Sequence, residues 1–135
     1  MACYNGNKDV VQLLLDNSDR IELNARDSNG LTAFIWACNN GHKDVVKLLL
    51  DHSGRIELNA RCNYGWTAFM WACSLGRYYV VKLLLNYSDS KIDIYARDNH
   101  GLTAFRLALR NGKEETVKLL QKFKSDSFGN FKAQS

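Results

Sequence analysis

The chain contains four near-copies of one unit, spaced by 35 or 36 residues. The block Asn5–Asp16 recurs as Asn40–Asp51 and again as Leu75–Asn86, each time 35 positions further along. A fourth copy, Asn111–Gln121, follows after 36 residues, and the extra residue falls in the loop near Ser88. One unit of this length cannot bury its Phe, Trp, Val and Leu side chains alone, whereas stacked neighbours share a continuous core. The repeat therefore predicts a solenoid.

Each unit predicts two short helices and a turn. A threonine before each apolar run carries the hydroxyl acceptor of an N-cap, so it should open a first helix of about two turns. A later glycine suits the left-handed conformation just past a helix end. The Val-Val-x-Leu-Leu-Leu block that follows predicts the second helix. The threonines are Thr32, Thr67 and Thr103, and the glycines are Gly41, Gly76 and Gly112.

A third segment of each unit alternates apolar and polar residues, in Ile21–Asn24, Ile56–Asn59 and Ile92–Tyr95. Ala-Arg and a glycine-containing turn follow each time. This pattern predicts a short extended arm that leads into a hairpin tip projecting from the helices.

The unit resembles the ankyrin repeat over residues 1 to about 123. The resemblance is most literal in Gly30–Phe34, Gly41–Leu50 and Glu57–Ala60. The family's proline and histidine after the threonine are replaced, by alanine and by Ile35, Met70 or Arg106. The resemblance implies an all-α, ankyrin-type helix-turn-helix solenoid with short β-hairpin tips between repeats.

We predict an ankyrin-repeat domain over 1–123, with a partial repeat 1–24 and repeats 25–59, 60–95 and 96–123, then a polar tail, 124–135. The incomplete first unit would leave an apolar face uncovered. Either the chain is part of a longer array or that end meets a second copy. Unless that end self-associates, we expect a monomer. The tail is either mobile or docks Phe128 and Phe131 onto the last unit.

The sequence offers no active site. Cys3, Cys38 and Cys73 recur at the repeat spacing and should be buried thiols, whereas Cys62, in a tip, should be exposed. No His-Glu-x-x-His, Cys-x-x-Cys or phosphate-binding glycine spacing is present, and Asp51-His52-Ser53 are adjacent residues that cannot form a catalytic triad. We therefore expect no enzymatic activity, no metal and no cofactor.

Composition narrows the setting. The longest apolar run, Ala68–Cys73, is too short for the roughly 18 residues of a membrane span, and the polar opening Met1–Asp9 lacks the features of a secretory signal. We expect a cytoplasmic protein, with the nucleus as the alternative. The net charge of +4 is too small and scattered to indicate nucleic-acid binding.

What remains is a surface. The hairpin tips vary between copies, and in the resembled family the tips and the ends of the first helices commonly form a concave recognition face. Tyr64 and Trp66 are the leading candidates, because aromatic residues with a polar tip dominate interfaces. Carried over, the expected face is Ser28, Asn29, Leu31, Asn39, Asn40, Asn63, Tyr64, Trp66, Ser74, Leu75, Asn99, His100, Leu102, Arg110 and Asn111.

Two neighbouring features leave alternatives open. Arg26, Arg61 and Arg97 form either a basic column beside the face or local pairs with Asp27 and Asp98. Tyr78-Tyr79 replaces a charged pair, and is either an aromatic patch on the outer helices or packing within the array. Trp36 and Trp71 are expected in the core.

The resemblance and the variable tips favour a non-enzymatic module that binds a partner protein, as a scaffold or adaptor. The alternative is the substrate-recruiting part of a larger enzyme complex, such as a ubiquitin ligase or kinase assembly. Asn24 and Asn59 also resemble the ankyrin asparagine that some hydroxylases modify. Nucleic-acid binding through the arginines is the weakest hypothesis.

Overall fold

The computed structural model describes residues 8, 12, 23–87 and 91–123. Its helices are α2 (Ala33–Asn39), α3 (Lys43–Leu50), the short 3-10 helix η3 (Ser53–Arg55), α4 (Ala68–Ser74), α5 (Tyr78–Leu85) and α6 (Ala104–Arg110). Residues 114–123 are helical as well. Cys3, Phe128 and Phe131 lie outside the described residues.

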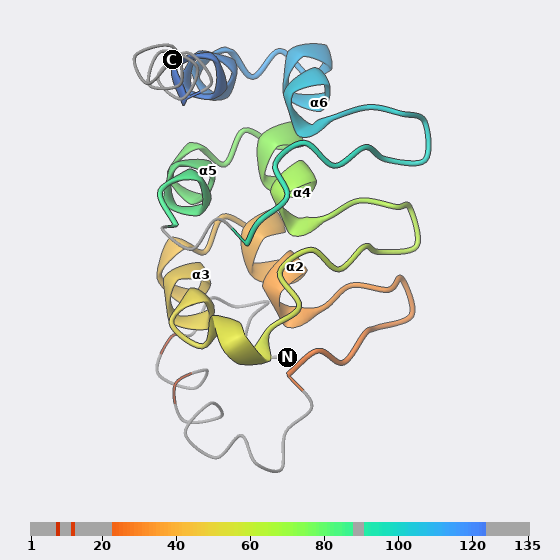
Figure 1. Cartoon of the computed structure of the whole chain (residues 1–135), viewed down its shortest axis with the longest axis vertical. Helices are drawn as coiled ribbons and strands as arrows, with labels where there is room; N and C mark the ends of the chain where they lie inside the picture. The colour runs from red at the N-terminus through yellow and green to blue at the C-terminus, as the bar shows by residue number, and fades with distance from the viewer. Residues whose placement is uncertain (1–7, 9–11, 13–22, 88–90, 124–135) are drawn as a thin grey trace, which may run out of the picture.

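The helices stack in two rows. Helices α2, α4 and α6 pack on one another in an inner row, and α3 packs on α5 in an outer row. Three loops project to the same side of the inner row (Figure 1). We call them tip 1 (26–31), tip 2 (61–66) and tip 3 (97–102). The paired helices therefore form the predicted solenoid.

The helix ends confirm the predicted signals. The hydroxyl of Thr32 accepts a hydrogen bond from the Ile35 amide at 3.2 Å, and Thr67 and Thr103 cap α4 and α6 in the same way. Gly41 has a φ of +70°, a backbone conformation that is strained for residues with a side chain. This glycine reverses the chain between α2 and α3.

The core runs through both rows. Val45 and Val46 of α3 and Val80 and Val81 of α5 are buried, together with the phenylalanines of α2 and α4. Cys38 and Cys73 are also buried, as predicted. Burial raises the pKa of both thiols, and for Cys38 the nearby Cys73 adds to the effect.

The extended arms expected from the alternating pattern are wrong. Leu58 and Asn59 form a turn, in which the Ala60 amide donates to the Glu57 carbonyl. The alternation arises because Ile56 and Leu58 point into the core and Asn59 points outward. Asn59 Nδ2 donates to the Lys91 carbonyl at 2.7 Å, so this amide holds two units together. Asn24 does the same one unit earlier.

Candidate functional site

The three tips are bonded to one another through side chains. Arg26 Nη1 donates to the Gly30 carbonyl of its own tip and to the Arg61 carbonyl of the next. Arg61 Nη1 repeats the pattern with the carbonyls of Gly65 and Arg97. These bonds of Arg26 and Arg61 run to backbone carbonyls, and the alternative of local pairs with Asp27 and Asp98 stays a prediction. Each of these arginines thus bonds to one carbonyl of its own tip and one of the next tip, and Arg26 adds an ion pair with Glu57 at 3.9 Å.

Asparagines add a second set of bonds between tips. Asn63 Nδ2 donates to the Ser28 carbonyl at 3.0 Å, and Asn99 Nδ2 donates to the Tyr64 carbonyl at 3.3 Å. Tips 2 and 3 approach so closely that a Cβ at Gly65 would lie 2.5 Å from Asn99 Oδ1. These bonds and this contact hold the tips in a fixed register.

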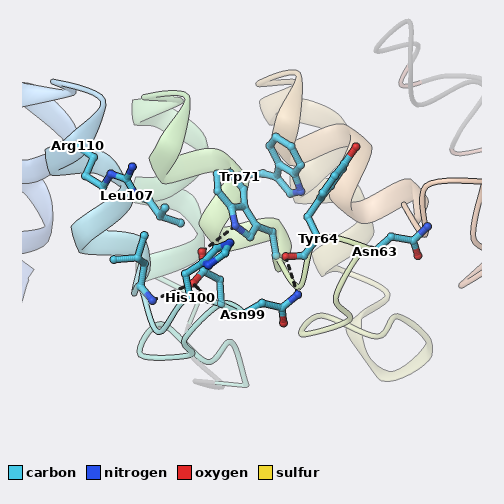
Figure 2. Close-up of a pocket in the computed structure, with 10 residues that line it drawn as sticks. Asn63, Tyr64, Trp71, Asn99, His100, Leu107 and Arg110 are labelled. Carbon is cyan, nitrogen blue, oxygen red and sulfur yellow. Dashed lines mark hydrogen bonds between the residues drawn. The ribbon is translucent and has the colours of Figure 1, made fainter.

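A pocket with a volume of about 580 Å³ opens between tips 2 and 3. Figure 2 shows Tyr64 and Asn63 on one tip, His100 and Asn99 on the other, and Leu107 and Arg110 on α6. The lining residues are Asn63, Tyr64, Trp66, Trp71, Asp98, Asn99, His100, Leu102, Leu107 and Arg110. The pocket therefore combines an aromatic wall with polar groups from both tips.

The two aromatic residues that tip 2 contributes to the wall differ in exposure: Tyr64 is 63% exposed, whereas Trp66 is half-buried. The Trp66 ring packs edge-on against Trp71, with ring centroids 4.6 Å apart. Trp66 Nε1 donates to Asp98 Oδ2 at 3.0 Å. Trp66 is thus less exposed than Tyr64, because its indole bonds to Asp98 of the next repeat.

Asp98 is buried at the base of tip 3 and accepts three hydrogen bonds. Besides Trp66, the backbone amides of His100 and Leu102 donate to its Oδ1 at 2.8 and 2.9 Å. Burial alone would raise the pKa of Asp98. The two amides, the indole and the charge of His100 outweigh burial and lower the pKa below its ordinary value of 3.8.

Several residues that were expected to be exposed are buried instead. Leu31 and Ser74 are buried, Leu31 in the core and Ser74 where its hydroxyl accepts from Asn111 Nδ2 at 2.7 Å. Cys62, expected to be exposed, is only 5% exposed because it lies at the base of tip 2, where Asp27 and Asp98 lie in the other tips. Trp36 and Trp71 pack against the core without being fully buried.

Other expected contact residues lie outside the pocket lining. Asn40 Nδ2 donates to the Trp36 carbonyl, and the Asn39 carbonyl accepts from Arg77. Leu75 is exposed at the end of α4. The pocket brings together seven members of the expected face, Asn63, Tyr64, Trp66, Asn99, His100, Leu102 and Arg110.

Trp71, Asp98 and Leu107 line the pocket but were not among the expected contacts. A signal for Trp71 was present in the sequence. Aspartate stands nine residues before Trp36, at Asp27, but Cys62 stands nine residues before Trp71. In the structure, the hydrogen bonding of Trp36 and Trp71 differs accordingly.

Metal-binding clusters and membrane-spanning helices are absent from the part of the chain that the structure describes. Among residues 8, 12, 23–87 and 91–123, no group of three or more His, Cys, Asp or Glu side chains could hold a metal ion. Within the same ranges, no helix is both long and apolar enough to cross a bilayer. Ser53 is occupied by a hydrogen bond from the Tyr87 hydroxyl.

Stacked helix pairs with projecting, mutually bonded tips define a repeat solenoid. A family model described as ankyrin repeats (3 copies) matches the chain over residues 1–98 and 57–130. The chain belongs to the ankyrin-repeat family. Ankyrin repeats are generally protein–protein interaction modules, and the family is typically non-enzymatic. Comparison with curated proteins found no match.

Proposed function

We propose that the chain is a non-enzymatic scaffold or adaptor, which binds a partner protein on the face formed by tips 2 and 3 and the inner helices α4 and α6. The single observation that carries this proposal is the exposed Tyr64 at the edge of an aromatic-lined pocket. Tyrosine and tryptophan are enriched at the centres of protein interfaces, where a large ring is buried and its polar tip keeps a hydrogen bond.

The bonds between tips support the same face. Binding costs less when the groups that make contact are already held in place, because less conformational entropy is lost. Arg26, Arg61 and Asn99 bond to the backbone of neighbouring tips and so hold Tyr64 in position. In this proposal these residues brace the face rather than specify the partner.

The outer helices offer a second candidate binding surface. A substitution at Tyr79 can distinguish it from the face at the tips. Tyr79 on α5 is 68% exposed, with its ring 5.3 Å from that of Tyr78 and the Lys43 ammonium 5.6 Å away. We place the binding face at the tips, because Tyr64 lies at the edge of a pocket that Trp66 and Trp71 also line. The cytoplasm, or the nucleus, stays the predicted location, because free thiols such as Cys38 persist in a reducing compartment.

Affinity capture from cells tests the proposal, with the wild-type chain beside Tyr64→Ala. Tyr95→Ala is a matched control, since Tyr95 is 62% exposed and does not line the pocket. We expect a protein that is captured by the wild type and by Tyr95→Ala and lost from Tyr64→Ala. Prey lost only from Tyr79→Ala would move the site to the outer helices. Identical prey from every variant would contradict the proposed face.

A further inference from the structure

The last inner helix, α6, carries positive charge that the other two inner helices lack. Helices α2 and α4 contain no charged residue, whereas α6 contains Arg106 and Arg110. Arg106 stands where α2 and α4 have Ile35 and Met70, which are each 1% exposed. Another inner helix packs on α2 and on α4, whereas among the described residues no further inner helix follows α6 (Figure 1). The exposed Arg106 therefore lies at the end of the inner row.

Three arginines form a row at this end of the array. Thr103 caps α6, and Arg106 and Arg110 follow it at positions i+3 and i+7, which lie on one face of a helix about one turn, or roughly 5.4 Å, apart. Arg97 on tip 3 forms an antiparallel bridge with Thr103, so its backbone lies beside the start of this face. All three arginines are exposed. We call Arg97, Arg106 and Arg110 the arginine row.

The arginine row has no acidic partner within the part of the chain that the structure describes. Neither of the two ion pairs among those residues includes a member of the row. Asp98 on tip 3 is 8% exposed, and it already accepts from Trp66 and from two backbone amides of the tip. Arg61 donates to a carbonyl of the following tip, whereas no described tip follows Arg97. The exposed guanidinium groups of the row can therefore bind an anion from outside the chain.

Charge indicates which occupant fits this end of the array. Residues 124–135 contain two lysines and one aspartate, a net charge of +1, and the whole chain carries +4. Both this segment and a second copy would thus bring net positive charge to a positive surface. An acidic segment of a partner protein is complementary instead, because guanidinium groups bind carboxylates through paired hydrogen bonds.

Two contacts favour a protein over a nucleic acid as the acidic partner. Arg110 also lines the pocket beside Tyr64, so the arginine row continues the face proposed above for a partner protein. Leu109, on the same helix, is 47% exposed and offers an apolar surface that a protein side chain can cover.

We propose that the arginine row binds an acidic segment of the partner protein, whose carboxylates are spaced by roughly one helical turn, or about 5–6 Å. The segment crosses the end of the array from tip 3 along α6, and Arg110 connects it to the pocket between tips 2 and 3. This inference rests on the proposed function and deepens it, because it gives the chemistry of the partner.

Binding of two peptides to the full chain tests the inference. The probes are rhodamine-labelled peptides of Glu-Ala or Gln-Ala repeats of equal length, followed by fluorescence anisotropy at about 50 mM salt, where surface charges are only partly screened. We expect the Glu peptide to bind with an affinity about tenfold or more above that of the Gln peptide, because several modest ion pairs act together.

Two triple variants of equal net charge provide the matched comparison. The first is Arg97→Gln, Arg106→Gln and Arg110→Gln, which removes the arginine row. The second replaces, with glutamine, three exposed lysines on the outer helices and the last helix, namely Lys47, Lys82 and Lys122.

We expect the first variant to lose about tenfold or more of its affinity for the Glu peptide and the second less than about threefold, because lost net charge alone affects both equally. Urea denaturation checks that both variants fold. If the first does not fold, Arg106→Gln beside Lys82→Gln makes the same comparison with a smaller expected loss.

Equal binding of the two peptides, or an equal loss in the two triple variants, would overturn the inference. Tighter binding of an oligo-dT strand than of the Glu peptide at the same salt would overturn it as well, in favour of a nucleic-acid surface.

Capture from cells separates this inference from the proposed function. A partner lost from Tyr64→Ala but kept by the first triple variant would remove the arginine row and leave the proposed function standing. A partner lost from the first triple variant but kept by Tyr64→Ala would support the arginine row and contradict the proposed face at Tyr64.

Discussion

The indole N–H of Trp66 donates to the carboxylate of Asp98, 32 positions further along the chain, at 3.0 Å. The bond crosses from tip 2 to tip 3, whereas the equivalent Asp27 accepts from Trp36 of its own repeat. The difference follows from two substitutions between repeats. Trp66 stands where the other tips have Leu31 and Leu102, and no tryptophan follows Asp98 nine residues later, where Leu107 stands.

Replacing Trp66 with phenylalanine should therefore weaken the stack as well as the pocket. The ring's contact with Trp71 is largely kept, but the buried carboxylate loses one of its three donors. We expect the free energy of unfolding to fall by about 1–3 kcal/mol, as is usual for hydrogen bonds to charged groups. Urea denaturation measures the change. In a double-mutant cycle with Asp98→Asn, the two losses should be less than additive by about 1 kcal/mol, and strict additivity would show that the bond contributes nothing.

The lowered pKa of Asp98 makes part of the stability depend on pH. Because the folded-state pKa lies below the ordinary value of 3.8, the ionised carboxylate stabilises the fold above that value. This contribution is lost as the pH falls through the folded-state pKa. The wild type should exceed Asp98→Asn in stability at neutral pH, and the gap should close as the pH falls below 3.8 through the lower folded-state pKa. A gap that stays constant in urea denaturation as the pH falls below 3.8 would contradict the assignment.

Cys62→Asp should stabilise the chain. The carboxylate would accept from the buried Trp71 Nε1 and from the tip amides of Tyr64 and Trp66, as Asp27 does with Trp36, Asn29 and Leu31. Satisfying a buried donor and two amides should raise the free energy of unfolding by about 1–2 kcal/mol at neutral pH. Cys62→Ala, measured in parallel, controls for loss of the thiol. A destabilised Cys62→Asp with a normal Cys62→Ala would show that tip 2 cannot accommodate a carboxylate.

Much of the fold could be predicted because its determinants are local and repeated. The start of each inner helix is set by one threonine hydroxyl, as at Thr67, and each reversal by one glycine, as at Gly41. Repetition in register then fixes the stack. The expected extended arm failed because an alternating pattern such as Ile56–Asn59 does not distinguish a strand from a turn whose side chains also point alternately inward and outward.

The site was less predictable, because it depends on contacts between repeats. The sequence indicated Tyr64, which is exposed on a tip. It could not reveal that Arg61 reaches the Arg97 carbonyl, or that Trp66 turns toward Asp98, since both contacts cross between repeats whose relative placement only the structure gives. The buried Trp71 Nε1 has no hydrogen-bond partner among the described residues, because Cys62 stands where the neighbouring repeat has Asp27. This could be recognised only once the structure showed the bond between Asp27 and Trp36.

Hydrogen exchange of the chain, free and bound to a partner obtained by capture, tests the central claim most directly. If the partner binds on the tip face, backbone amides of 61–66 and 97–102 should exchange more slowly in the complex, and those of the outer helices α3 and α5 should change little. Protection confined to α5 around Tyr79, with tips 2 and 3 exchanging as in the free chain, would contradict the account.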